Sequence, residues 1–206
     1  DSLLEAALRA GLALDYGCSN GNCGLCKARL VSGQVKKTRP HDYVLSEADK
    51  SAGCILMCSN TAVNDLIIEA TEAGGVQDIP LQRIAARVKR IEPLGDEILL
   101  LHLQTPRTNR LRFLAGQQVS LSVPGNSMAA NYPVASCPCD DRNLEFHVPR
   151  VPGNAFSDYV STALKPTDVV TVDGPKGTFV FDDESHRPAI FIACDTGFAP
   201  IMSLIE

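Results

Sequence analysis

The sequence predicts three consecutive parts: an α+β domain, an antiparallel β-barrel or sandwich, and the first strand and helix of an α/β domain. Residues 1–74 begin with a capped amphipathic helix and continue into a glycine-rich and cysteine-rich loop and short strands. Residues 75–185 contain strand-like segments separated by turn signals, at the spacing of a small all-β domain. Residues 186–206 hold a continuous apolar run followed by a helix-like ending.

The composition and net charge of the chain argue against nucleic acid and membranes as binding partners. The chain has 206 residues, of which 45% are hydrophobic, enough for two buried cores. Its net charge of −5 comes without a basic run, so we expect neither nucleic acid nor membrane as a partner. The longest apolar stretches are of strand length, whereas a membrane helix needs about 20 residues. Eight cysteines are too few for a secreted disulfide scaffold, and no signal peptide is visible, so we expect a cytoplasmic protein.

The helix of the first domain is predicted to begin at a capping box. Ser2 and Glu5 have the spacing at which each side chain accepts a hydrogen bond from the other's backbone N–H, and Gly11 marks the end of the helix. Ser32-Gly33 between two strand-like runs predicts a β-hairpin. In this domain we expect strands at 28–31, 34–37, 54–58 and 65–69, and a short capped helix at 46–50.

After residue 75 the sequence first predicts a series of strands, and from residue 189 it predicts the strand and helix that begin a doubly wound α/β domain. We expect strands at 83–91, 97–104, 118–123, 132–136, 144–148, 168–172 and 178–181, with one helix at 155–164. The run 189–194 is predicted to be a buried strand, and 200–206 the helix that follows it.

Three cysteines in the first loop carry the most specific signal. Cys18, Cys23 and Cys26 are separated by four and then two residues. This C-x4-C-x2-C spacing, completed by one distant cysteine, is typical of plant-type [2Fe–2S] sites. The chain must wrap around such a cluster and direct backbone N–H groups at the sulfurs, and the glycines of the loop permit that path. The sequence therefore predicts a one-electron carrier.

Other interpretations of the loop fit its spacing less well. A structural zinc site usually has two C-x2-C pairs, and only Cys23 and Cys26 have that spacing. A thioredoxin-like C-x-x-C opens a helix after a buried strand, which this loop does not. The fourth ligand is either Cys54 or Cys58, because both lie on one face if 54–58 is a strand.

Residues 1–70 resemble the plant-type ferredoxin domain of bacterial flavin reductases. The resemblance rests on three stretches, Ser2–Ala7, Tyr16–Cys26 and Gly53–Cys58. It implies a β-grasp ferredoxin fold, makes Cys58 the fourth ligand, and leaves Cys54 as a small buried side chain. The family domain has a β-hairpin before its first helix that this sequence lacks, so we expect either a fragment or a sheet that is short of two strands.

Residues 81–206 resemble the ferredoxin–NADP reductase superfamily. Five motifs follow the family's order, beginning at Phe113, Asn131, Gly153, Gly174 and Asp195. The resemblance implies an antiparallel six-stranded FAD-binding β-barrel and the first strand and helix of an NAD(P)-binding domain that is truncated. Carried over to this chain, the FAD site comprises Tyr132, Pro133, Val134, Ala135, Ser136, His147, Val148, Arg150, Gly153, Asn154, Ala155, Ser157, Thr196 and Gly197.

Two of these positions have a plain physical role. The face of Tyr132 could lie against the isoalloxazine ring, although a tyrosine in a strand is most often part of the core. The helix that begins near Gly153 offers free N–H groups to a pyrophosphate, although by itself it is only a capped helix.

The flavin motif also departs from the family pattern. Where the family has Arg-x-Tyr-Ser, this chain has Ala130 and Pro133 in place of Arg and Ser. A methyl group cannot replace a bidentate guanidinium–phosphate contact, so FAD binding would depend on another cation such as Arg150. The family's Gly-Gly-Thr-Gly becomes Cys194-Asp195-Thr196-Gly197, and we expect NAD(P)H to bind only to the full-length protein.

The resemblance implies a reductase component of a larger redox system. NAD(P)H would deliver a hydride to FAD, and single electrons would pass to the cluster and on to a partner such as a terminal oxygenase or a deoxysugar dehydrase. The rivals are a flavin-less iron–sulfur carrier or redox-responsive module with a degenerate barrel, and a zinc-stabilised binding module. We expect Cys194 to be buried in a strand, and Cys137 and Cys139 to be thiols of a surface loop.

Overall fold

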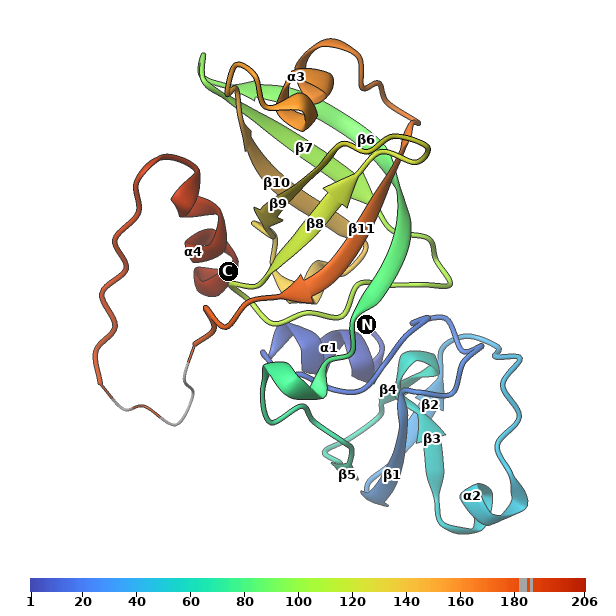
Figure 1. Cartoon of the computed structure of the whole chain (residues 1–206). Coiled ribbons are helices and arrows are strands. Elements are labelled where there is room, and N and C mark those ends of the chain that lie inside the picture. The colour runs from blue at the N-terminus through green and yellow to red at the C-terminus, as the bar shows by residue number, and fades with distance from the viewer. Residues whose placement is uncertain (182–184, 186) are drawn as a thin grey trace.

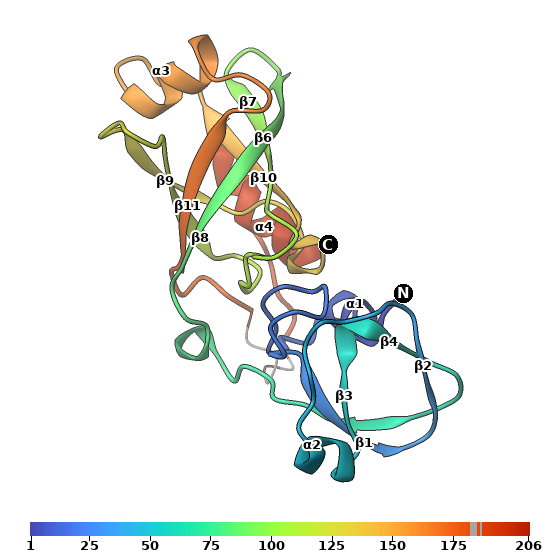
Figure 2. The ribbon, with the colours of Figure 1, turned by 90° about the vertical axis from the view of Figure 1, so that its right-hand side faces the viewer.

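The computed structural model describes residues 1–181, 185 and 187–206, and it places them in two bodies joined by the chain that leads into β6 (Figure 1). Figure 2 shows the two bodies stacked end to end, with α1 and α4 near their junction. The predicted boundary between residues 185 and 186 lies partly outside the described residues. The elements of the first body are α1 (Leu3–Arg9), β1 (Lys27–Ser32), β2 (Val35–Lys37), α2 (Glu47–Ser51), β3 (Cys54–Leu56), the 3-10 turn η1 (Met57–Ser59), β4 (Asn60–Ala62), β5 (Ile67–Glu69) and the 3-10 turn η2 (Val76–Asp78).

Both predicted helices of the first body form, and each begins directly after its N-cap serine, Ser2 for α1 and Ser46 for α2. Ser2 accepts from the Glu5 N–H at 3.2 Å and the Ser2 N–H donates to Glu5 at 2.8 Å, which confirms the predicted start of α1. Ser46 caps α2 in the same way through Asp49. The buried residues Leu3 and Leu4 turn α1 toward a core shared with the start of β1 and with η1.

The predicted hairpin around Ser32-Gly33 is wrong. β1 and β2 both form, but β1 pairs with β3 and β5, while β2 pairs with β4 in a separate two-stranded sheet. At Gly33 the backbone has φ +93°, and an added Cβ would lie 2.5 Å from the Asp65 carbonyl oxygen. The turn therefore packs against a third segment and directs β2 away from β1.

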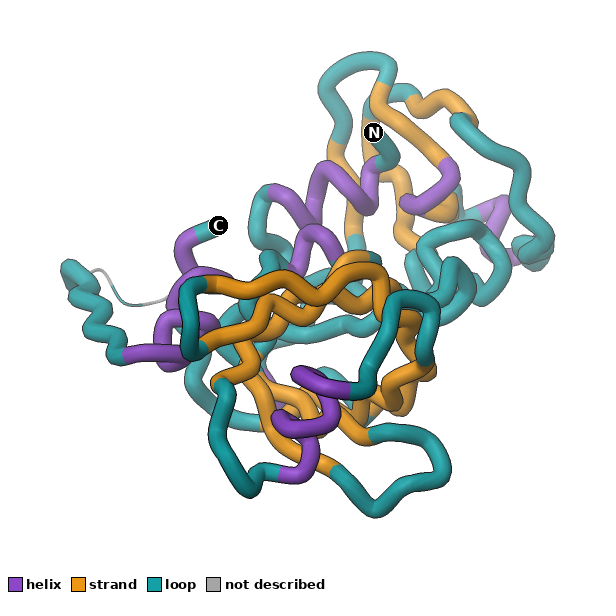
Figure 3. The backbone as a smooth tube through the Cα atoms, turned by 90° about the horizontal axis from the view of Figure 1, so that it is seen from above, coloured by secondary structure: helices purple, strands orange, loops and turns teal. Residues whose placement is uncertain are grey.

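The second body is built on one antiparallel sheet of six strands. Its elements are β6 (Gln82–Leu94), β7 (Ile98–Gln104), β8 (Gln118–Ser122), β9 (Ala129–Pro133), the 3-10 turn η3 (Pro138–Asp140), β10 (Asn143–Pro149), α3 (Ala155–Thr162) and β11 (Val169–Lys176), followed by the 3-10 turn η4 (Asp195–Gly197) and α4 (Phe198–Ile205). The strand order is β10-β7-β6-β11-β8-β9. Seen from above, the strands curl around a common centre and α3 covers one end (Figure 3).

Alternating apolar residues fill the inside of this curled sheet. Along β7 and β10 every second side chain, such as Leu101, Leu103 and Phe146, is fully buried. Phe156 of α3 closes the core at the end of the sheet. The chain directly after the edge strand β9 approaches the other edge strand, β10, where the Ala135 N–H donates to the Glu145 carbonyl oxygen at 2.8 Å.

Two strand predictions in the C-terminal half are wrong. Residues 178–181 are not a strand, because β11 ends at Lys176 opposite Gln118 and the chain then leaves the sheet, with Phe181 half-exposed. The apolar run 189–194 is not a strand either, and Ile190 and Ile192 are 87% and 88% exposed. A strand of a doubly wound sheet is stabilised by parallel neighbours, and no strand pairs with this run among the described residues. The helix expected after it is present as α4.

Candidate functional site

Cys26 and Cys58 lie side by side where the pairing of β1 and β3 ends. Lys27 pairs with Leu56 at the end of the ladder, and the Met57 N–H donates to the Cys26 carbonyl oxygen at 3.0 Å. The Cys26 and Cys58 Sγ atoms are 3.2 Å apart, and both side chains are buried. A residue of the loop and one 32 positions later therefore form a pair.

Cys18 and Cys23 form a second pair, surrounded by backbone N–H groups. The N–H groups of Cys23 and Asn22 donate to the Cys18 Sγ at 3.4 Å and 3.3 Å, and the Cys18 N–H donates to the Cys23 Sγ at 3.5 Å. Hydrogen bonds to the sulfurs are the means by which proteins stabilise cluster thiolates. Cys18 is buried and Cys23 is exposed, so this pair reaches the surface.

The four thiols fit a binuclear cluster better than a single metal ion. A [2Fe–2S] cluster takes two thiolates on each of its two irons, and the four cysteines lie as two pairs. A structural zinc ion would need all four to converge on one point. Within residues 1–181, 185 and 187–206, no three or more His, Cys, Asp or Glu side chains are grouped so as to hold one metal ion.

The paired thiols differ in how readily they ionise. The hydrogen bond with Cys26 lowers the pKa of Cys58 to about 6, against the opposing effect of burial. The same contact, together with burial, raises the pKa of Cys26. Burial opposes the ionisation of Cys18, but the N–H groups around its sulfur lower its pKa overall.

Two glycines of the loop leave no room for a side chain. Gly24 has φ +77°, and an added Cβ would lie 2.3 Å from the Tyr43 ring. Gly21 has φ +89°, and an added Cβ would lie 2.5 Å from the His41 Cβ. The Tyr43 N–H also donates to the Gly21 carbonyl oxygen at 3.0 Å. The segment around Tyr43 therefore packs directly on the loop and fixes its path.

Cys54 lies apart from both pairs. It stands opposite Arg29 in the ladder of β1 and β3, and it is half-buried, not fully buried as expected. The sequence predicts Cys54 and Cys58 on one face of a strand, but β3 ends at Leu56 and η1 redirects the chain. This turn is what brings Cys58 to Cys26.

The predicted flavin residues lie at the end of β9 and just after it, in β10, at the start of α3 and in η4. Hydrogen bonds join the first three of these places. The Glu145 N–H donates to Ser136 Oγ at 3.2 Å, which ties β10 to the chain after β9. Ser157 Oγ donates to the Pro149 carbonyl oxygen at 2.6 Å, which ties the start of α3 to the end of β10. Of the predicted residues, Tyr132, Val134, Ala135, Ser136, His147, Val148 and Ser157 are buried, Pro133 and Thr196 are half-buried, and Arg150, Gly153, Asn154, Ala155 and Gly197 are exposed.

Tyr132 is part of the core of the sheet. It is 6% exposed, and its ring centroid lies 5.6 Å from that of Phe156 in α3. Burial raises the pKa of its hydroxyl. The tyrosine of the flavin motif is thus packed by protein in this structure.

Some donors at the start of α3 are already used within the chain. Asn154 accepts from the Ser157 N–H at 3.0 Å, and the Gly153 N–H donates to the Asp158 carboxylate at 3.2 Å. The predicted phosphate site therefore coincides with an ordinary helix cap.

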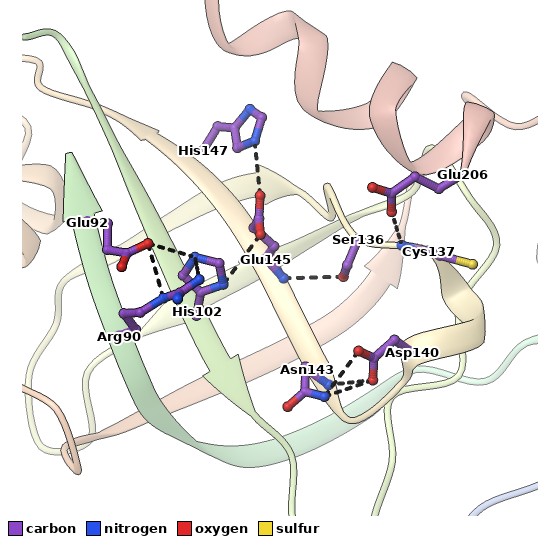
Figure 4. A network of polar contacts seen from close by, with 10 residues as sticks. All are labelled: Arg90, Glu92, His102, Ser136, Cys137, Asp140, Asn143, Glu145, His147 and Glu206. Atoms are coloured by element: carbon purple, nitrogen blue, oxygen red, sulfur yellow. Dashed lines mark hydrogen bonds and ion pairs between the residues drawn. The ribbon is translucent and has the colours of Figure 1, made fainter. Parts of the chain in front are cut away.

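His147 belongs to a polar network on the outer side of the sheet (Figure 4). His147 Nε2 lies 3.5 Å from Glu145 Oε1, and His102 Nδ1 lies 3.3 Å from Glu145 Oε2. Beside them, Arg90 Nε lies 3.1 Å from Glu92 Oε2. The hydrogen bond with His147 lowers the pKa of Glu145. The network runs from the buried His147 to the exposed Arg90.

Sequence reasoning missed a polar contact between the two bodies, next to residues 15–26, the loop that contains Cys18, Cys23 and Cys26 (the cluster loop). Asp141 accepts from Ser19 Oγ at 3.4 Å, lies 3.9 Å from the Arg110 guanidinium and faces the Tyr16 hydroxyl. The Arg110 N–H donates to the Gly17 carbonyl oxygen at 3.1 Å. Burial raises the pKa of Asp141 to about 6. In the sequence this aspartate is only one of several charges in a loop, which predicts an exposed turn.

A second contact between the bodies lies at the start of the same loop. Arg112 forms an ion pair with Asp15 and donates to the Ala13 carbonyl oxygen at 3.1 Å. The Arg112 side chain is largely buried. The cluster loop is thus held by the second body at both Asp15 and Ser19.

The remaining cysteines differ from the sequence expectations. Cys137 and Cys139 are joined in a disulfide, with their Cα atoms 5.1 Å apart, and are not free thiols. Cys194 is exposed, because the strand expected to bury it does not form.

A cavity of about 730 Å³ lies where α1, the chain around Phe113, the disulfide segment and α4 meet. Its lining includes Arg112, Cys137, Phe181 and Ser203, and none of the four cluster cysteines. None of the predicted flavin residues lines this cavity, although Cys137, which follows Ser136, does.

Two family models match this chain, one over each body. A 2Fe-2S iron-sulfur cluster binding domain matches residues 1–63, and an oxidoreductase FAD-binding domain matches residues 85–181. The chain thus contains a match to a 2Fe-2S cluster binding domain followed by a match to an oxidoreductase FAD-binding domain. The resemblance stated from the cysteine and flavin motifs is confirmed.

The chain is similar along its whole length to several longer reductases. The chain is 34% identical over 205 residues to the CDP-6-deoxy-L-threo-D-glycero-4-hexulose-3-dehydrase reductase of Yersinia pestis, covering 100% of this chain and 61% of that protein. It is 28% identical over 209 residues to the reductase component of propane 2-monooxygenase of Mycolicibacterium goodii, covering 100% of this chain and 60% of that protein. The crystal structure of an Amycolatopsis cytochrome P450 reductase superposes with a TM-score of 0.58 at 31% identity, covering 100% of this chain and 62% of that one. The chain thus spans about three-fifths of the length of the curated relatives it matches.

Among residues 1–181, 185 and 187–206, no helix is long and apolar enough to cross a membrane.

Proposed function

We propose that this chain carries a [2Fe–2S] cluster on Cys18, Cys23, Cys26 and Cys58. The single observation that carries the proposal is the arrangement of these cysteines as two adjacent pairs, with backbone N–H groups directed at the Cys18 sulfur. When bound, the cluster accepts and donates one electron at a time. The chain's own contribution is to hold the thiolates, supply hydrogen bonds and exclude water from Cys26 and Cys58.

We propose that FAD binds to the outside of the six-stranded barrel, where the end of β9, β10 and the start of α3 lie together. The match to the oxidoreductase FAD-binding domain supports this, as do the hydrogen bonds that join these elements through Ser136 and Ser157. The fit is partial, because Ala130 offers no phosphate grip and Tyr132 is packed against Phe156. Arg150 is an exposed cation beside the start of α3 and is our candidate for the phosphate contact.

We propose that the whole protein transfers electrons from NAD(P)H through FAD to the cluster and on to a partner enzyme. The named relatives are reductase components of a dehydrase and of a monooxygenase, so the partner proposed here is an enzyme of one of these kinds. In this proposal, residues 1–74 are the ferredoxin domain, residues 75–185 the FAD-binding barrel and residues 186–206 the start of the NAD(P)-binding domain. Because cluster thiolates suit a reducing compartment, we place the protein in the cytoplasm.

A second function is favoured by a specific observation. Ala130, Pro133 and the packing of Tyr132 against Phe156 would suit a barrel that has lost its flavin. The chain would then be an iron–sulfur carrier or a redox-responsive module.

One experiment separates the two functions in the chain as it stands. The cluster-loaded chain is incubated with FAD, desalted and illuminated anaerobically with EDTA as the sacrificial electron donor. If it is a reductase, about one FAD stays bound and the reduced cluster appears in the electron paramagnetic resonance spectrum as the flavin is reduced. A chain that keeps its cluster but retains no FAD would be the flavin-less carrier. Bound flavin that becomes reduced while the cluster stays oxidised would contradict transfer from FAD to the cluster.

A further inference from the structure

Residues 136–142, which form most of the connection between β9 and β10, are anchored on two sides. At the start of this segment the Ser136 carbonyl oxygen accepts from Ser203 Oγ of α4 at 2.8 Å. The Cys137 N–H donates to Glu206, the residue after α4, at 3.1 Å (Figure 4). At its other end Asp141 accepts from Ser19, next to the cluster ligand Cys18. The segment therefore links the predicted flavin strand to the cluster loop.

A disulfide lies in the middle of this segment. Cys137 and Cys139 are separated by one residue, and both are half-buried, so small reagents can reach them. The Cys139 N–H is directed at the Cys137 Sγ, 3.1 Å away. An N–H donor stabilises a thiolate at that sulfur when the disulfide opens.

A permanent structural role explains this disulfide poorly. The entropy that a cross-link removes from the unfolded chain grows with the loop it closes, and a loop closed over one residue gains little. Four cluster thiols also require reducing surroundings, where disulfides are usually transient and serve in catalysis or redox sensing. Both arguments favour a bond that opens and closes.

We propose that Cys137 and Cys139 are a thiol–disulfide redox site for low-molecular-weight thiols, and that its state sets how firmly residues 136–142 hold the cluster loop. In the reduction, an external thiolate attacks the Cys139 Sγ, the disulfide breaks, and the Cys137 thiolate leaves, stabilised by the Cys139 N–H. A second external thiol then displaces Cys139 from the mixed disulfide. Two external thiols become one disulfide, and the two electrons and two protons they give up reside on Cys137 and Cys139.

The first test follows the two thiols directly and does not depend on flavin. The cluster-loaded chain is equilibrated anaerobically in glutathione buffers from reduced to oxidised, quenched in acid and alkylated, and the peptide with residues 137 and 139 is examined by mass spectrometry. We expect one two-electron transition, from both thiols alkylated to neither. Thiols that stay alkylated in the most oxidised buffer, or a disulfide that persists in the most reduced one, would overturn the redox site.

Single variants sharpen this test. In Cys139→Ser, Cys137 has no partner, so we expect it to accumulate as a mixed disulfide with glutathione. Cys194→Ser removes an exposed cysteine elsewhere and should leave the transition unchanged. A transition that moves with Cys194→Ser would show pairing with the wrong thiol and would contradict the proposal.

The second test asks whether the redox state reaches the cluster loop. Amide hydrogen exchange of residues 13–20 is compared in the oxidised and reduced chain, with the visible spectrum showing that the cluster is retained. We expect exchange there to be several-fold faster after reduction, and to be independent of the buffer in the double variant Cys137→Ser/Cys139→Ser. Equal exchange in both states of the unmodified chain would refute the link to the loop. Failure of cluster binding itself would appear separately, as loss of the visible spectrum.

Discussion

The Cys26 and Cys58 sulfurs lie 3.2 Å apart, although 32 positions separate the two residues in the sequence. The contact forms because β3 ends at Leu56 and the 3-10 turn η1 carries Cys58 back toward the loop. Cys54, two residues before that end, remains in the ladder opposite Arg29. The two candidates for the fourth ligand are thereby separated in space.

Substituting these two cysteines should have opposite effects on the cluster. Cys58→Ser removes one member of the buried pair, so the visible charge-transfer bands should be lost or strongly altered. Cys54→Ser changes a half-buried residue outside both pairs and should leave the spectrum as it is. Absorption and electron paramagnetic resonance spectra of the two purified variants check this, and the reverse outcome would show that Cys54 is the ligand.

Crowding at Gly24 should make the loop intolerant of a side chain. In Gly24→Ala the new Cβ would meet the Tyr43 ring, so iron retained per chain should fall to a small fraction of the wild-type value. Gly11→Ala is the matched control, because Gly11 has φ +84° but no atom within 4 Å of an added Cβ. It carries the backbone strain of about 1 kcal/mol without the clash. Equal iron contents in the two variants would mean that packing on Tyr43 does not shape the loop.

Restoring the family arginine should strengthen FAD binding. A guanidinium at position 130 can form charge-assisted hydrogen bonds to phosphate, each worth about 1.5–3 kcal/mol, so Ala130→Arg should lower the Kd for FAD by roughly tenfold to a hundredfold. Fluorescence titration of FAD measures the change. Arg150→Ala is the companion variant and should weaken binding if Arg150 holds the phosphate. An unchanged Kd for Ala130→Arg would place the flavin away from β9.

Asp141 predicts a pH dependence of the contact between the two bodies. Its pKa is about 6 in the folded chain and about 3.9 in an unfolded one, so the folded state binds more protons between these values. The free energy of unfolding should therefore fall as pH rises from about 4 to about 6. Asp141→Asn should remove this contribution, so that the free energy of unfolding falls by about 1 kcal/mol less between pH 5 and pH 7 than in the wild type.

Denaturant unfolding at several pH values, with cluster absorbance and circular dichroism as probes, measures this slope. Asp96 is exposed in the turn between β6 and β7, away from this contact, and Asp96→Asn is the control that should keep the wild-type slope. Identical slopes in the wild type and Asp141→Asn would contradict a buried proton-binding group at this contact.

Several helices and strands could be predicted from residues that lie close together in the sequence. The capping box at Ser2 predicted the start of α1, and the cap at Ser46 predicted the start of α2, because each cap depends on residues only a few positions apart. Alternation of apolar residues predicted most strands of the second body, since the inside of that sheet is apolar throughout. The loop cysteines stood out for the same reason, as their spacing is local.

Features that depend on distant segments were not visible in the sequence. The Ser32-Gly33 turn has the composition of a hairpin, but packing against Asp65 sends β2 to another sheet. The run 189–194 has the composition of a buried strand and lacks a neighbouring strand within the described parts of the chain. The contact of Asp141 with Ser19 joins residues 122 positions apart, and no spacing rule connects them.

The cluster itself is the central claim, and its most direct test is chemical analysis of the purified chain expressed with adequate iron. Iron and acid-labile sulfide are counted per chain, and zinc is measured in the same sample. The two cysteine pairs predict two irons, two sulfides and no stoichiometric zinc. One zinc per chain, with neither iron nor sulfide, would contradict it.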